Sequence, residues 1–228
     1  MKGRIIGALW IAIALGGAYF GFEGRLFGAL FCFCLMMALG EILVIFYGEP
    51  PYGIQDEMMK YAPQTQALVL MMAAYISVSL TRDELALIVV VCTISDVGAF
   101  TVGKLMGRHK AKIVNHISPK KSYEGYVGGA ILPIVAIWLC PLLGIQVLPS
   151  QVSYIVLGGL LAEIGDLLGS ATKRRLGVKD SNEVLIQIPV FNVLEYPLKG
   201  HGGYLDRVDS MSLSLVGFVA IRLLASLC

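Results

Sequence analysis

The sequence predicts an all-α integral membrane protein, a polytopic helical bundle of about seven transmembrane helices. Of its 228 residues, 57% are apolar and only 15% are charged, whereas soluble domains carry roughly 25% charged residues. The mean hydropathy of +0.75 excludes a disordered chain, since disorder needs low hydrophobicity and high charge. The apolar runs are long and unbroken, which favours helices over the short alternating segments of a membrane β-barrel.

Seven apolar stretches are candidate transmembrane helices, because a helix needs about 20 residues to cross a bilayer. They are residues 5–22, 26–47, 65–80, 85–105, 126–148, 152–170 and 211–227. The first is interpreted as a retained span and not a signal peptide, since no small-residue cleavage site follows it. Pro133 and Pro141 are expected to kink the fifth span, because proline cannot donate a helical hydrogen bond.

The distribution of cations predicts the orientation of these spans. If the loop at 104–124 is cytoplasmic, the N-terminus and the loops after the second, fourth and sixth spans lie on the same side. That side then holds 15 of the 18 lysines and arginines, and only Arg25, Arg82 and Arg222 remain for the other. This asymmetry agrees with the positive-inside rule.

Acidic side chains inside the apolar stretches are candidate functional groups, because a charge within the membrane is costly. Asp96 lies about halfway along the fourth span, and Asp166 lies in the second half of the sixth. Glu163 shares a helix face with Asp166, since three residues separate them. Asp206 and Asp209 have the same spacing at the entry to the last span. Carboxylates are hard oxygen ligands suited to Mg²⁺.

Lysines and arginines accompany these acidic residues, and the combination reduces the number of functions that fit. Acids alone would indicate an ion pathway, whereas acids beside lysines and arginines indicate a metal–polyphosphate site. Phosphoryl and nucleotidyl transfer need metals to neutralise the moving phosphate and cations to hold the leaving group. Glycines at 200–203 (GHGG) and 128–129 allow close backbone approach. The sequence has no Walker loop, so phosphate binding is expected from side chains and helix ends.

Four blocks of the sequence resemble one known family. SATKRRLGVKD at 170–180 and GHGGYLDRVDS at 200–210 look like the signature of the phosphatidate cytidylyltransferases, or CDP-diacylglycerol synthases. SDVGAFTVGKLMGRHK at 95–110 and ISPKKSYEGYVGG at 117–129 are similar to the same family and follow in the expected order. The resemblance covers roughly half of the chain, and the combination is specific where any single block would be weak.

The resemblance implies a reaction in which CTP and phosphatidate give CDP-diacylglycerol and pyrophosphate. The implied partners are CTP, phosphatidate and membrane lipids, with a homodimer as an open option and no nucleic acid. The implied cofactor is Mg²⁺, as one or two ions. The expected location is the bacterial inner membrane, with the active site facing the cytoplasm. We divide the chain into N-terminal membrane helices at 1–84 and a catalytic membrane region at 85–228.

We assign roles to particular residues on this basis. The expected metal ligands are Asp96, Asp166, Asp206 and Asp209, and the last three are also assigned to catalysis. His201 is expected to touch a phosphate or to shuttle a proton. The residues expected to bind substrate phosphates are Lys120, Lys121, Lys173, Arg174 and Lys179. Glu41 and Glu163 are expected to be structural or to support their neighbours.

Each residue assignment has a structural alternative, and three other functions for the whole protein remain open. Buried polar contacts, helix capping or simple anchoring by positive charge would explain the same residue types. A CTP-dependent lipid kinase would keep the nucleotide but transfer its terminal phosphate. An ion-coupled transporter would use Asp96, Glu163 and Asp166. An inactive homologue is suggested by the separation of 21 residues between Asp180 and His201.

Overall fold

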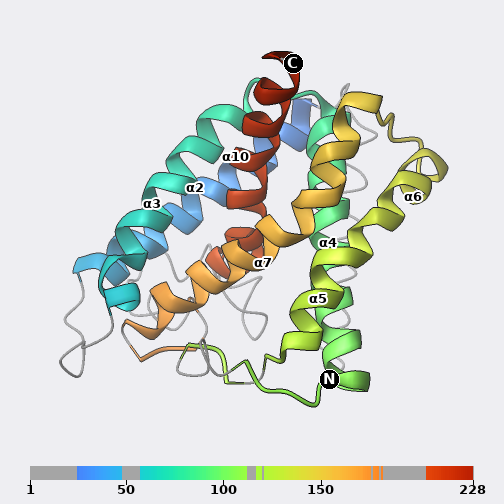
Figure 1. Cartoon of the computed structure of the whole chain (residues 1–228). Helices are drawn as coiled ribbons and strands as arrows, with labels where there is room; N and C mark the ends of the chain where they lie inside the picture. The colour runs from blue at the N-terminus through green and yellow to red at the C-terminus, as the bar shows by residue number, and fades with distance from the viewer. Residues whose placement is uncertain are drawn as a thin grey trace, which may run out of the picture. The chain divides into compact units, whose positions relative to one another are not determined.

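As the sequence predicts, the computed structural model is all-helical in class, with no β-strand in the part of the chain that it describes. It describes residues 25–47, 57–111, 117–119, 121–175, 177–179, 181 and 204–227. The helices are α2 (Arg25–Tyr47), α3 (Glu57–Ser77), α4 (Arg82–Met106), α5 (Tyr123–Ile131), α6 (Ala136–Leu142), α7 (Val152–Arg174) and α10 (Leu205–Leu227) (Figure 1). The expected span at 5–22 lies outside the described residues.

Four of the described segments are long and apolar enough to cross a membrane, which makes the chain an integral membrane protein. They are Arg82–Met106, Tyr123–Leu142, Pro149–Arg174 and Leu205–Ala225. These correspond to the fourth, fifth, sixth and seventh stretches of the sequence analysis. The expected number of about seven is not reached within the described part, where α2 contributes only a shorter apolar helix, Phe31–Leu43.

The fifth span is interrupted, as its prolines predict. α5 ends at Ile131, a 3-10 helix occupies Leu132–Val135, and α6 follows. Pro133 is the second residue of that 3-10 helix, where its missing N–H removes a regular helical hydrogen bond. Pro141 lies one residue before the end of α6. The start of α5 is capped by the Ser122 hydroxyl, which accepts a hydrogen bond from the Gly125 N–H at 3.2 Å.

The described residues form two compact units, and each is considered by itself. The first unit takes its described residues from Met1–Arg82 and Gly169–Val208, and the second from Asp83–Leu168 and Asp209–Cys228. In the first unit, α2 and α3 run side by side (Figure 1). The α7 and α10 helices contribute residues to both units.

A polar and aromatic contact joins α7 to α10 in the core of the second unit. The fully buried Tyr154 hydroxyl lies 2.7 Å from the Ser214 hydroxyl. Its ring packs edge-to-face on Phe218, with ring centroids 4.9 Å apart. Because a buried hydroxyl without a partner would cost about 1–3 kcal/mol, this hydrogen bond is what allows a tyrosine here.

Gly165 lets the same two helices approach more closely, and its replacement by alanine should destabilise the protein. A Cβ at Gly165 would lie 2.6 Å from the Asp209 carbonyl oxygen and 3.0 Å from the Ser210 Cα. Neither backbone atom can rotate away, so we expect overpacking to cost about 1–3 kcal/mol. The measurement is the thermal unfolding midpoint of the purified variant in detergent.

Gly217→Ala is the matched control for this prediction, because it makes the same change within α10. There the nearest atoms belong to the Leu161 side chain, with Cδ1 at 2.3 Å, and a leucine can change rotamer. Alanine also improves helix propensity by about 1 kcal/mol. A Gly165→Ala midpoint equal to or above that of Gly217→Ala would contradict the close-packing argument.

Candidate active site

A short loop between α4 and α5 carries Lys121, one of the residues predicted to bind phosphate. An antiparallel bridge pairs Lys110 with Ser122, and the Ala111 N–H donates to the Lys121 carbonyl at 3.2 Å. Beside it, the His109 ring Nδ1 lies 2.6 Å from Glu124 Oε1 on α5. The loop is therefore closed at its base, which gives Lys121 a defined position in the second unit.

The Lys121 ammonium lies between two carboxylates of α7. Its Nζ is 2.5 Å from Asp166 Oδ2 and 2.8 Å from Glu163 Oε2. Glu163 is only 4% exposed, whereas Asp166 is 30% and Lys121 23% exposed at the side chain, so one edge of this group remains accessible. The spacing of three residues that places Glu163 and Asp166 on one helix face is confirmed by this shared contact.

Asp96 belongs to the same group of charges. It lies on α4, is exposed, and interacts electrostatically with Asp166, Glu163 and Lys121. We call these four residues the Lys121 cluster. Asp209, on α10, belongs to the same compact unit. Asp209 is itself buried, and its Oδ1 accepts a hydrogen bond from the Ser210 N–H at 2.8 Å.

The electrostatics of the cluster keep Lys121 protonated. Burial alone would favour the neutral amine, but the carboxylates of Asp166 and Glu163 outweigh it and raise the pKa of Lys121 above its ordinary value. A raised pKa means that this charge stabilises the fold at every pH below the ordinary lysine pKa. The contribution is lost only as the pH rises through the higher folded-state value. The cluster therefore presents a fixed cation at neutral pH.

A second group of side chains surrounds Asp206 in the first unit. Asp206 Oδ1 pairs with the Lys173 ammonium at the end of α7, and Lys173 is only 7% exposed. Asp206 Oδ2 accepts hydrogen bonds from the Ser181 N–H at 2.9 Å and the Ser181 hydroxyl at 3.1 Å. We call Lys173, Ser181 and Asp206 the Asp206 cluster. The ion pair joins Lys173 of the block at 170–180 to Asp206 of the block at 200–210.

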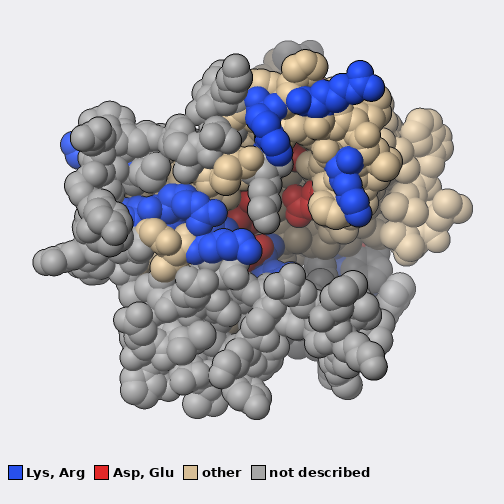
Figure 2. Space-filling view, turned by 90° about the horizontal axis from the view of Figure 1, so that it is seen from below, with Lys and Arg blue, Asp and Glu red and all other residues tan. Residues whose placement is uncertain are grey.

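The remaining sequence-predicted residues have different outcomes. Arg174 donates from Nη1 to the Val178 carbonyl at 2.6 Å and so closes the end of α7, while Lys179 is exposed. Lys120 and His201 lie outside the described residues. On the face shown in Figure 2, lysine and arginine side chains are accompanied by acidic ones. The assigned catalytic and substrate-binding roles stay predictions.

Two residues that contact these clusters, Ser181 and Tyr126, were not predicted from the sequence. Ser181 gives no signal, because a serine in a polar loop is an ordinary residue. Tyr126 of α5 lies under Lys121, whose ammonium is 4.7 Å from the ring centroid, an attractive cation–π distance. Its buried hydroxyl has no hydrogen-bond partner among the described residues. The ring lies in the YVGG segment, which the sequence analysis noted only for its glycines.

The carboxylates of the Lys121 cluster are the candidate donors for a metal ion. Among residues the structure describes, no three acidic, histidine or cysteine side chains are arranged as a closed metal cage. Asp96 and Asp166 nevertheless interact in one accessible group, and their carboxylate oxygens are the donors that Mg²⁺ prefers. These donors fit a Mg²⁺ ion, which would neutralise the charge of a bound phosphate.

The fold and site together define a helical membrane protein with ion-paired lysines and carboxylates at the ends of its spans. Residues 3–225 match the model of the cytidylyltransferase family. The chain therefore belongs to the cytidylyltransferase family.

Curated relatives carry one shared name. The chain is 36% identical over 166 residues to a phosphatidate cytidylyltransferase of Staphylococcus saprophyticus, covering 63% of this chain and 54% of that protein. It is 33% identical over 159 residues to one of Staphylococcus aureus, with the same coverage. One of Staphylococcus haemolyticus is 37% identical over 121 residues, covering 51% and 40%. The chain thus spans about half the length of these relatives. No solved structure matches it significantly.

Proposed function

We propose that this chain is a phosphatidate cytidylyltransferase, which converts CTP and phosphatidate into CDP-diacylglycerol and pyrophosphate. The observation that carries the proposal is the Lys121 cluster, a half-buried lysine between carboxylates on spans of a membrane protein, within the residues that match the family. The relatives named for this activity support the same substrates. The product would enter phospholipid biosynthesis.

The proposed reaction does not need a strong general base. A phosphate oxygen of phosphatidate attacks the α-phosphorus of CTP, and the bond from that phosphorus to the bridging oxygen of the β-phosphate breaks. Pyrophosphate leaves with the bonding electrons. Because the lipid phosphate is already ionised, the side chains need mainly to align the two substrates and to balance charge. Lys121 and the predicted cations Lys120, Lys173, Arg174 and Lys179 would serve that purpose.

We include Mg²⁺ in the proposal as one or two ions. Asp96 and Asp166 would hold a Mg²⁺ ion in the second unit, and Asp206 and Asp209 keep their predicted roles as ligands. When bound, Mg²⁺ supplies charge neutralisation for the triphosphate. Lys121 would remain the cation that the protein itself provides. His201 keeps its predicted role of contacting a phosphate or transferring a proton.

The location and topology complete the proposal. We infer about seven spans, with the active site on the cytoplasmic side of a bacterial inner membrane. The excess of lysines and arginines on that side supports this orientation, and a lipid substrate with a soluble nucleotide requires a site at the membrane surface. The division at 1–84 and 85–228 and the option of a homodimer stay predictions.

The experiment is an assay of the purified protein in detergent with CTP labelled at the α- or the γ-phosphate. We expect α-label to appear in lipid only when phosphatidate and Mg²⁺ are both present, and γ-label to appear only in pyrophosphate. Removal of Mg²⁺ by a chelator should stop the transfer. Transfer of γ-label to a lipid alcohol would instead identify a kinase, and no turnover with either acceptor would reject both enzymes.

A further inference from the structure

Glu41 is a fully buried carboxylate within the apolar helix α2, with 0% of the residue exposed. Both of its oxygens are used. Oε1 accepts a hydrogen bond from the Tyr204 N–H and Oε2 accepts one from the Leu205 N–H, each at 2.7 Å. Because a buried charge is strongly unfavourable unless it is hydrogen-bonded or paired, these bonds are a condition for a glutamate at this position.

The two N–H groups belong to the beginning of α10. The first N–H groups of a helix have no partner within it, and a negative charge beside them is favoured by the helix dipole. Glu41 therefore caps α10 from another helix, 163 residues away in the sequence. The capped residues come directly after the GHGG segment at 200–203.

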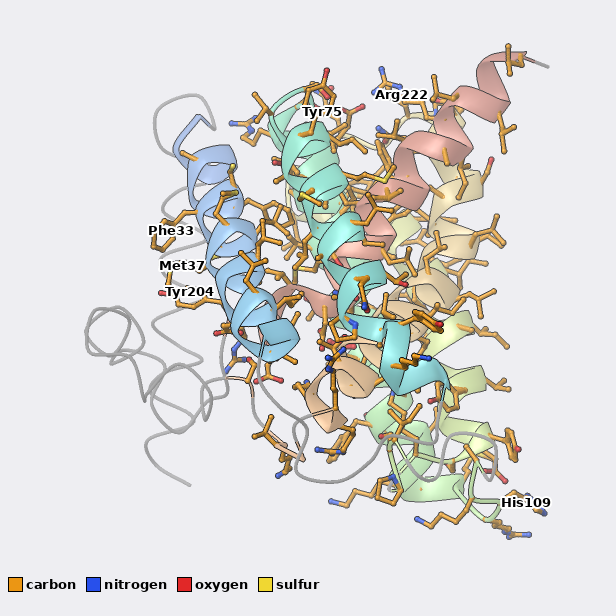
Figure 3. The ribbon with its side chains drawn as sticks, turned by 90° about the vertical axis from the view of Figure 1, so that its left-hand side faces the viewer. Phe33, Met37, Tyr75, His109, Tyr204 and Arg222 are labelled. Carbon is orange, nitrogen blue, oxygen red and sulfur yellow. The ribbon has the colours of Figure 1, made fainter. Side chains whose placement is uncertain are left out.

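A second contact from α2 reaches the same point. The Phe33 ring packs edge-to-face on the Tyr204 ring, with centroids 6.0 Å apart. Figure 3 shows Phe33, Met37 and Tyr204 grouped along one side of α2. The start of α10 is thus held through both its backbone and its first aromatic side chain.

The residue that follows this anchor is Asp206. Its two oxygens bind Lys173 and Ser181, and each residue of a helix turns the side-chain direction by about 100°. A shift of the α10 start by a fraction of a turn would therefore move Asp206 away from both partners. Fixing the Leu205 N–H fixes the direction in which Asp206 points.

We propose that Glu41 is a positioning residue for catalysis, which acts through the cap of α10 on Asp206. This inference rests on the proposed function, in which Asp206 is a catalytic residue. It gives α2, which lies within the residues that match the family, a part in positioning the proposed catalytic residue Asp206.

The test compares Glu41→Gln with Glu84→Gln. Glu84 is a matched control because it is also buried on a helix, with 6% exposed, and pairs with Arg222 through Oε1 at 2.5 Å. It lies in the first turn of α4, whose last turn leads into the loop of Lys121.

We expect E41Q to lower kcat by about 10-fold or more through misalignment. KM for phosphatidate should stay within about threefold, since the lost alignment acts mainly in the transition state. We expect E84Q to lower the unfolding midpoint while kcat stays within about twofold.

Hydrogen–deuterium exchange of the peptide covering 204–208 gives a readout independent of activity. Loss of the cap should speed exchange there in E41Q and not in E84Q. A kcat for E41Q within about twofold of wild type overturns the proposal. So does unchanged exchange at 204–208, or an equal loss of kcat in both variants.

Two further outcomes remain decisive. If E41Q does not accumulate, Phe33→Leu removes the aromatic contact more gently, and faster exchange with a fall in kcat of about two- to fivefold supports the proposal. No change in either overturns it. If the wild type itself shows no turnover, the proposed function fails, and the positioning claim is then decided by exchange alone: faster exchange in E41Q supports it and unchanged exchange overturns it.

Discussion

Asp166→Asn is expected to abolish measurable CDP-lipid synthesis while the protein still inserts and folds. The substitution keeps the size of the side chain but removes the negative charge that lies 2.5 Å from the Lys121 ammonium. It also weakens an oxygen donor proposed for Mg²⁺. Loss of one preorganised electrostatic group at a reacting phosphate costs about 10²–10³-fold in kcat. The measurement is α-label transfer from CTP to phosphatidate, at saturating substrates.

The control for this prediction is Asp83→Asn, which makes the same change on the first turn of α4. There Asp83 Oδ2 accepts a hydrogen bond from the Gln146 N–H at 3.1 Å, so the variant should change stability slightly and leave turnover within about twofold. Gel filtration and the unfolding midpoint show whether each variant is folded. A folded Asp166→Asn protein with wild-type turnover would remove Asp166 from the site.

The helical fold could be predicted because hydropathy reports where a segment meets lipid. It reports the ends of helices less well. The last span was expected to begin at 211, but α10 begins at Leu205, because polar residues such as Asp206 and Asp209 continue the helix beyond the apolar stretch. α3 likewise begins at Glu57 and not at 65. The length of an apolar stretch and the length of the hydrogen-bonded helix that contains it are different quantities.

The site could be predicted only where one helix holds several of its members. The spacing of Glu163 and Asp166 fixes a common face whatever the tertiary structure, and both meet Lys121. Glu41 is different, since its N–H partners follow 163 and 164 residues later. Because burying a carboxylate is unfavourable, Glu41 must have hydrogen-bond donors or a cation beside it. The local sequence does not show which residues these are.

Lys121→Gln is expected to damage both stability and activity. The ammonium lies between two carboxylates, and Glu163 is only 4% exposed. Without the cation these groups repel each other and one remains buried without its charge partner, which costs about 3–5 kcal/mol in known buried pairs. Turnover should also fall by about 100-fold or more, since a fixed positive charge near the phosphates is lost. Unfolding in denaturant and the CTP assay measure the two effects.

Neutralising Glu163 in the same chain separates the two effects. Lys121→Gln with Glu163→Gln removes the unpaired buried charge, so stability should recover by about 1–3 kcal/mol relative to Lys121→Gln alone, a coupling expected between residues in contact. Activity should not recover, because the cation is still missing. Lys104→Gln, at an exposed lysine in the last turn of α4, controls for the loss of one positive charge and should change neither quantity greatly. If the double variant regained wild-type turnover, Lys121 would serve only to compensate Glu163, and its place in the active site would be refuted.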